Sequence, residues 1–97
     1  MEHFNQLTPA EAERLALLSE ELGEAQQAIG KILRHGYEST HPEGGPTNRE
    51  ALMRELGDVR AASWLMELGG DIDGTLVQRA SADKLNKVKR YLHHQEN

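Results

Sequence analysis

Apolar residues recur at alternating spacings of three and four over residues 15–32, and this periodicity restricts the segment to an amphipathic helix. The stripe consists of Leu15, Leu18, Leu22, Ala25, Ile29 and Ile32. Thr8 suits the cap, Pro9 suits the first helical position, and Glu11 follows the cap by three residues. We therefore expect the first helix to begin after Thr8 and to stop at Gly36.

A second helix is predicted after a loop over residues 36–47, where glycine and proline break any helix. Thr47 or Asn48 is expected to cap it, and Gly69 and Gly70 to end it. Its predicted buried stripe is Leu52, Leu56, Val59, Ala62, Ser63 and Met66.

The C-terminal third predicts two shorter helical pieces. A helical turn is expected from Asp71 or Asp73 through Val77, and a final helix from Ser81 or Ala82 to about His93. The residues expected to face inward on the final helix are Leu85, Val88 and Leu92. No segment alternates apolar and polar residues, so the predicted fold class is all-α, with residues 1–97 as a single domain.

The composition excludes several classes of protein. Without cysteine, the chain has no disulfides, thiolate metal sites or thiol nucleophile. A net charge of −5 and few aromatic residues argue against binding to nucleic acid. No apolar run is long enough to span a membrane, and the N-terminus does not resemble a signal peptide, so we expect a cytoplasmic protein.

A four-residue phrase occurs twice, as E-L-G-E over residues 21–24 and as E-L-G-D over residues 55–58. Each copy places two acids three residues apart, on one face of a helix. Two such helices packed together would aim four carboxylates at one point, where they repel one another and resist burial. Mg²⁺ or Mn²⁺ between them would remove this cost, because hard cations prefer carboxylate oxygens.

Two further features of these helices bear on function. Gly23 and Gly57 lie inside the acidic phrases, and a glycine in mid-helix predicts the close approach of another helix or of a ligand. Such an approach, with the short chain, predicts an oligomer. Lys31 lies roughly 10 Å beyond Glu24 along the helix, which is about the reach of a triphosphate.

With these features, the chain resembles the MazG-like group of all-α nucleoside triphosphate pyrophosphohydrolases. The resemblance covers residues 12–92 and rests on the two acidic phrases and on the segment 28–36. It implies a four-helix-bundle-like domain that forms a homodimer or homotetramer. It also implies hydrolysis of (deoxy)nucleoside triphosphates to the monophosphate and pyrophosphate with Mg²⁺ or Mn²⁺. The 30 positions over residues 25–54 are long for this family.

The resemblance also assigns roles to particular residues. The metal ligands would be Glu21, Glu24, Glu55 and Asp58. Glu20 would act as an outer acid or would orient water, so that Glu20 and Glu21 form the catalytic pair. The substrate-binding residues would be Lys31, Arg34, His35, Lys84, Asn86, Lys87 and Arg90.

Three alternatives stay open. A di-iron carboxylate bundle would need a Glu-x-x-His pair, whereas the fourth residue of each phrase here is an acid. A non-catalytic helical interaction or regulatory module fits the small, acidic chain. A phosphoribosyl-ATP pyrophosphohydrolase would share the bundle and its acids. Trp64 is the only indole available to stack on a base, but it is predicted more readily as a core or interface residue.

Overall fold

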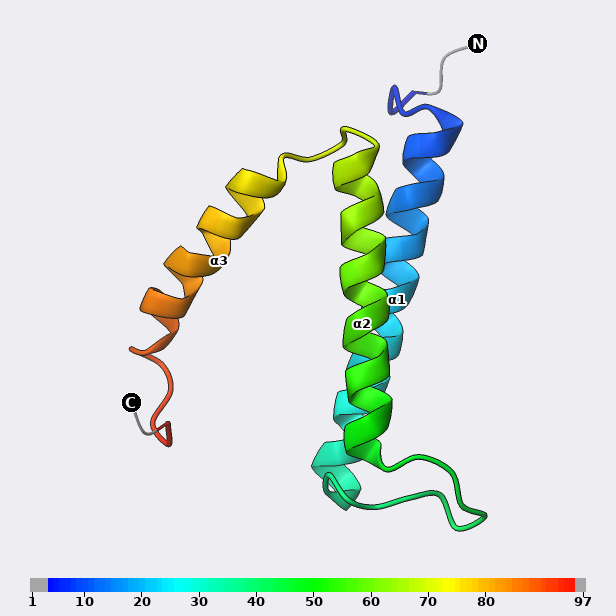
Figure 1. The fold of residues 1–97 in the computed structure, drawn as a ribbon, viewed down its shortest axis with the longest axis vertical. Helices are drawn as coiled ribbons and strands as arrows, with labels where there is room; N and C mark the ends of the chain where they lie inside the picture. Colours follow the sequence, from blue (N-terminus) through cyan, green and yellow to red (C-terminus); the bar gives the residue numbers. More distant parts are fainter. Residues whose placement is uncertain (1–3, 96–97) are drawn as a thin grey trace.

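The computed structural model describes residues 4–95, and all of its regular structure is helical. Figure 1 shows the three helices, α1 (Pro9–His35), α2 (Asn48–Leu68) and α3 (Gly74–Val88). Over the described range no residue lies in a strand, so the all-α fold class is confirmed. None of the helices in this range is long and apolar enough to cross a membrane.

The first two helices begin and end where the sequence predicts. Thr8 and Glu11 form a capping box at the start of α1, and Thr47 and Glu50 form a second one at the start of α2. At the other end of α1, the N–H of Gly36 donates to the Ile32 carbonyl at 2.7 Å. Gly36 has a φ of 88°, a conformation that side chains with a Cβ rarely adopt.

The loop between α1 and α2 is fastened to the first turn of α2. The Asn48 amide donates to the Gly36 carbonyl at 3.0 Å, and the Arg49 guanidinium donates to Glu38 at 2.7 Å. The same guanidinium lies 4.2 Å from the centre of the Tyr37 ring. These contacts fix the turn of the α1–α2 hairpin.

Most of the fully buried residues between α1 and α2 are small. The buried apolar residues of the described chain are Ala25, Ala28, Ala62 and Met66. The predicted apolar stripes are therefore only partly correct. Leu15, Leu22, Ile29 and Leu56 are 42–51% exposed, because they flank the α1–α2 contact instead of filling it.

The prediction of two separate helical segments in the C-terminal third was wrong. One helix, α3, runs through Ser81 and ends at Val88, well before His93, and Asp73 caps it by accepting from the Thr75 N–H at 2.9 Å. The intervening Gln, Arg and Ala are good helix formers, so nothing interrupts the helix between Val77 and Ser81. The described chain therefore has three helices, and the predicted four-helix bundle is wrong for a single chain.

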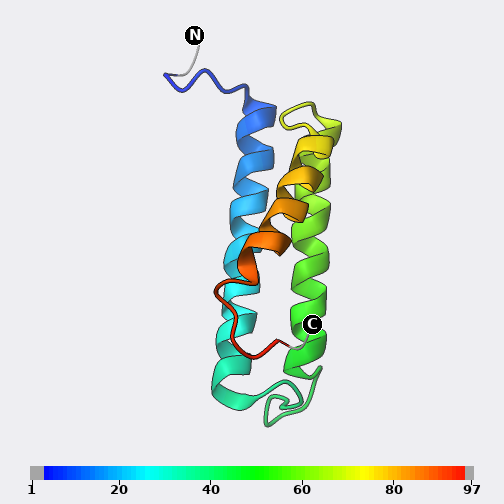
Figure 2. The same cartoon turned by 90° about the vertical axis from the view of Figure 1, so that its left-hand side faces the viewer.

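Helix α3 leaves the hairpin instead of packing on it. Extensive packing between helices is confined to α1 and α2, and α3 has no buried residue. In Figure 1 α3 stands apart from the hairpin, and in the perpendicular view of Figure 2 it runs in front of α1 and α2. Of the residues predicted to face inward here, Leu85 and Leu92 are therefore exposed, at 65% and 47%, and Val88 is only half-buried.

A salt bridge fixes the turn that leads into α3. The Arg14 guanidinium donates to both oxygens of Asp71, at 2.6 and 2.8 Å. Both side chains are largely covered, with 24% of Arg14 and 11% of Asp71 exposed. This bidentate pair ties the segment after α2 to the first turns of α1.

Candidate metal centre

The two acidic phrases meet in the structure. Glu21 and Glu24 of α1 and Glu55 and Asp58 of α2 each offer one carboxylate oxygen, and the four oxygens lie within 4.8 Å of one another. We call these four residues the acidic cluster. The spacing of three residues puts each pair on one helix face, and the antiparallel hairpin brings the two faces together.

Two members of the acidic cluster are held in an unfavourable environment. Glu21 and Glu55 are half-buried, whereas Glu24 and Asp58 are exposed. One oxygen of Glu21 and one of Glu55 are buried without a hydrogen-bond partner. A buried carboxylate oxygen with no donor loses its hydration and gains nothing in exchange. None of the four acids forms a salt bridge within the described chain, so no side chain there neutralises their charge.

This environment raises the pKa values of two members of the cluster, Glu21 and Glu24. Burial raises the pKa of Glu21, and the charges of Glu24 and Asp58 raise it further. A carboxyl–carboxyl hydrogen bond with Glu55 is the main cause that raises the pKa of Glu24, and burial adds to it. Either a proton or a cation would relieve the repulsion. An oxygen-only donor set in this state fits a hard divalent ion such as Mg²⁺ or Mn²⁺.

A pocket of about 640 Å³ lies at the loop end of the hairpin. Lys31, Arg34 and His35 of α1 line one side, so three predicted substrate-binding residues share one cavity. The remaining lining residues are Ser39, Thr40, His41, Pro42, Gly44, Pro46, Asn48 and Ala51. The lining contains no acid, and neither Lys31 nor Arg34 forms a salt bridge within the described chain. The pocket is therefore positively charged in a protein of net charge −5.

The structure does not gather all the predicted site residues. Glu20 is exposed and lies next to the acidic cluster but is not among its four members. Four of the predicted substrate-binding residues are exposed on α3 or just after it, away from the hairpin. They are Lys84, Asn86, Lys87 and Arg90. Trp64 is 61% exposed and is absent from the pocket lining, so of the two predicted positions, core or interface, the core of the single chain is excluded and the interface stays a prediction.

Sequence reasoning did not single out the loop residues that line the pocket. Its residues Ser39, Thr40 and His41 lie between the two predicted helices and carry no periodic signal. The only signals available were the length of the segment and its cluster of glycine and proline residues.

No family model matches the chain, and neither the curated proteins nor the solved structures provide a match. The functional argument therefore rests on the acidic cluster and the pocket.

Proposed function

We propose that this protein is a metal-dependent nucleoside triphosphate pyrophosphohydrolase, which converts a (deoxy)nucleoside triphosphate and water into the monophosphate and pyrophosphate. The observation that carries this proposal is the convergence of four carboxylates from two helices, two of them with buried oxygens that lack a partner. A non-functional acidic surface would not bury such oxygens, because each one destabilises the fold.

The acidic cluster would hold Mg²⁺ or Mn²⁺ through Glu21, Glu24, Glu55 and Asp58. A bound ion of this kind supplies two things, neutralisation of phosphate charge and a lowered pKa for an attacking water. Glu20, one residue before Glu21, would orient that water. The half-buried Glu21 and Glu55 hold their carboxylates in place between the two helices. Phosphoryl transfer asks for positioning and charge stabilisation more than covalent chemistry, which suits a site made of acids and bases.

The pocket would hold the far end of the polyphosphate. Lys31 follows Glu24 by seven residues on α1, a rise of roughly 10 Å, so a triphosphate can span from the acidic cluster to the pocket. The volume of about 640 Å³ is within the range of small-molecule sites. Arg34 and His35 would add positive charge and hydrogen-bond donors there.

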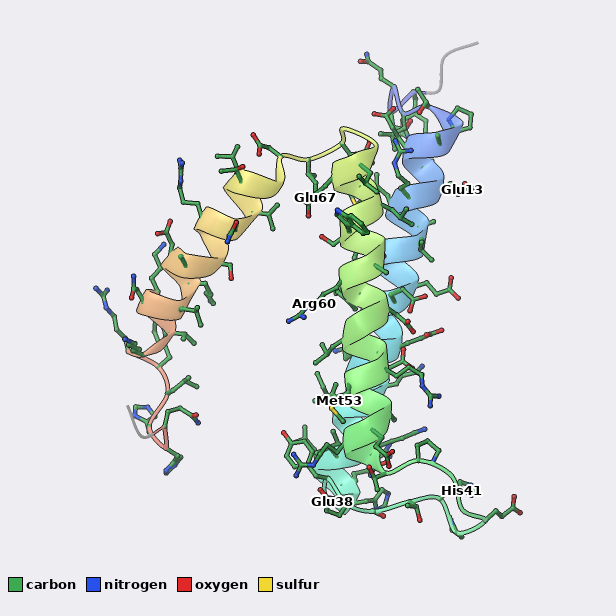
Figure 3. All side chains as sticks on the ribbon, in the orientation of Figure 1. Glu13, Glu38, His41, Met53, Arg60 and Glu67 are labelled. Atoms are coloured by element: carbon green, nitrogen blue, oxygen red, sulfur yellow. The ribbon has the colours of Figure 1, made fainter. Side chains whose placement is uncertain are left out.

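The decisive test is to remove one charge at a time from the acidic cluster. Glu24→Gln and Asp58→Asn keep the side-chain size and are expected to reduce nucleotide hydrolysis by orders of magnitude and to weaken Mn²⁺ binding. Glu13→Gln is the matched control, because Glu13 lies on the same helix as Glu24 and points away from the hairpin (Figure 3). The assays are release of pyrophosphate from a panel of nucleoside triphosphates and calorimetric titration with Mn²⁺.

Lys31→Ala separates the pocket from the acidic cluster. If Lys31 binds the phosphate chain in the ground state, the substitution should raise KM more than it lowers kcat. Turnover at the wild-type level in both acid variants would contradict the proposed function, as would an absence of Mn²⁺ binding to the wild type.

A non-catalytic interaction module is the second candidate, because the chain exposes many large apolar side chains. This reading predicts no metal-dependent release of pyrophosphate from any nucleotide. It also predicts that the acidic-cluster substitutions leave the protein's only activity, association with a partner, unchanged.

A further inference from the structure

The pocket at the loop end of the hairpin is much larger than the end of a triphosphate requires. Its volume is about 640 Å³. A terminal phosphate group takes up about as much space as three water molecules, which is roughly 90 Å³ in the liquid. With a nucleoside triphosphate bound as proposed above, most of the pocket would therefore remain unfilled by the substrate.

The unfilled part of the pocket lies on the side away from the acidic cluster. Ala51 lines the pocket and precedes Glu55 by four residues, so the near edge begins one helical turn, roughly 6 Å, from the cluster. On α1, Arg34 lies three residues past Lys31, roughly 4.5 Å farther from the cluster. A group that fills the pocket is therefore attached to the end of the polyphosphate that is remote from the metal.

The lining of the pocket combines apolar surface with hydroxyl groups. Pro42, Pro46 and Ala51 contribute the apolar surface, and Ser39 and Thr40 contribute the hydroxyl groups. A nucleoside presents the matching chemistry, because its base has apolar faces and polar edges and its sugar carries hydroxyl groups. A longer chain of phosphates would leave the apolar surface uncovered.

His41 offers an aromatic ring to a base, and Figure 3 shows it on the loop that joins α1 and α2. The Glu43 N–H donates to His41 Nδ1 at 3.1 Å, so the proton of the neutral ring is on Nε2. The His41 carbonyl accepts from the Gly44 N–H at 2.8 Å. These two hydrogen bonds hold the ring within its turn, and histidine rings stack on unpaired bases.

The loop that forms the outer wall of the pocket is tied to α2. The Ser39 carbonyl accepts from the Asn48 N–H at 2.9 Å, and the Tyr37 carbonyl accepts from the Arg49 N–H at 2.8 Å. The pocket is therefore formed before a ligand binds, as is usual for small-molecule sites.

We infer, on the basis of the proposed function, that the substrates are dinucleoside polyphosphates and that the pocket binds their second nucleoside. A triphosphate reaches from the acidic cluster to Lys31, so a nucleoside beyond Lys31 requires a bridge of three or four phosphates. A bridge of two phosphates is too short. Lys31 and Arg34 would contact the bridge, and His41 would stack on the second base.

The reaction is the same attack by water that the proposed function describes. The water oxygen forms a bond to the phosphorus next to the first nucleoside, and the bond from this phosphorus to the bridging oxygen breaks. The bridging oxygen keeps the bonding electrons and leaves with the rest of the polyphosphate. A dinucleoside tetraphosphate and water thus give one nucleoside monophosphate, one nucleoside triphosphate and two protons, which pass to the solvent.

The test compares initial rates of hydrolysis by the whole chain with Mg²⁺. The substrates are ATP, diadenosine diphosphate, diadenosine triphosphate and diadenosine tetraphosphate, with the guanosine series in parallel. We expect KM for the tetraphosphate to be about 5- to 150-fold lower than KM for the matching nucleoside triphosphate, the range that the stacking of one base gives. The diphosphate should show no such gain. Equal KM values would overturn the inference and leave the proposed function standing, whereas an absence of hydrolysis of every nucleotide would overturn both.

His41→Asn tests the pocket directly. An asparagine side chain can accept from the N–H two residues on, so this variant keeps the hydrogen bond from the Glu43 N–H and loses only the ring. It should raise KM for diadenosine tetraphosphate at least about 5-fold more than KM for ATP. The matched control is His93→Asn, since His93 lies after α3 and outside the pocket lining, and it should change neither value. An equal rise for both substrates in His41→Asn would overturn the inference, because the pocket would then hold the base of a single nucleotide.

Discussion

Replacing the two mid-helix glycines by alanine provides the sharpest test of what surrounds the hairpin. Gly23 lies inside α1 and Gly57 inside α2, and each belongs to an acidic phrase. A Cβ at either position would meet nothing within 4 Å. Alanine should therefore be tolerated at both.

The size of the effect follows from backbone entropy. Glycine in a helix interior costs about 0.8–1.0 kcal/mol relative to alanine. With no contact to lose, Gly23→Ala and Gly57→Ala should each stabilise the fold by about that amount. The two sites lie on different helices, so the double variant should gain about 2 kcal/mol. For a domain of this size this corresponds to a rise of roughly 8–16 °C in melting temperature.

The assay is thermal and chemical unfolding followed by far-ultraviolet circular dichroism, with Gly36→Ala as the control. Gly36 also has open space around its Cβ position, but its φ of 88° would strain alanine. That variant should therefore lose stability while the other two gain it. A loss of stability in Gly23→Ala or Gly57→Ala would refute this reasoning, because it would mean that another helix or a ligand approaches that side of the hairpin.

Three further predictions follow, two on ionisation and one on helix capping. The Arg14 guanidinium holds the pKa of Asp71 below its ordinary value of 3.8, so the stability from this pair is present at neutral pH and lost as the pH falls through the lowered pKa. The difference in melting temperature between the wild type and Asp71→Asn should therefore shrink below about pH 4. Burial raises the pKa of Glu21, so the stability of the protein depends on the ionisation of this group in the opposite direction. Without metal, the stability is highest below the ordinary pKa of 4.5, and it falls as the pH rises through the raised pKa. Glu21→Gln should accordingly raise the melting temperature at pH 7 without metal. Thr8→Ala and Thr47→Ala each remove one capping box and should cost about 1 kcal/mol by denaturant titration.

The ends of the first two helices could be predicted because local chemistry sets them. Thr8, Pro9 and Glu11 satisfy the free N–H groups of the first turn wherever the helix packs. The positive φ of Gly36 ends α1 in the same local way. The convergence of the acidic cluster was predictable too, because a spacing of three on each helix leaves one common face.

The course of α3 could not be predicted in the same way. Periodicity indicates which side of a helix is apolar, but it does not indicate which surface covers that side. Leu85 and Leu92 were therefore assigned to the interior of the same chain, where the structure leaves them exposed. The pocket residues Ser39 and His41 were not predicted for another reason, since hydrogen bonds and not a repeating pattern set their positions. The Ser39 carbonyl accepts from the Asn48 N–H at the start of α2, and the His41 carbonyl accepts from the Gly44 N–H within the loop.

The small residues between α1 and α2 explain the environment of the acidic cluster. Ala25, Ala28 and Ala62 let the helices approach closely, and this closeness buries an oxygen of Glu21 and one of Glu55. The larger residues Leu15, Leu22, Ile29 and Leu56 flank this contact and stay 42–51% exposed. The alanines at the α1–α2 contact therefore account both for the burial of two carboxylate oxygens and for the exposure of the large apolar side chains beside the contact.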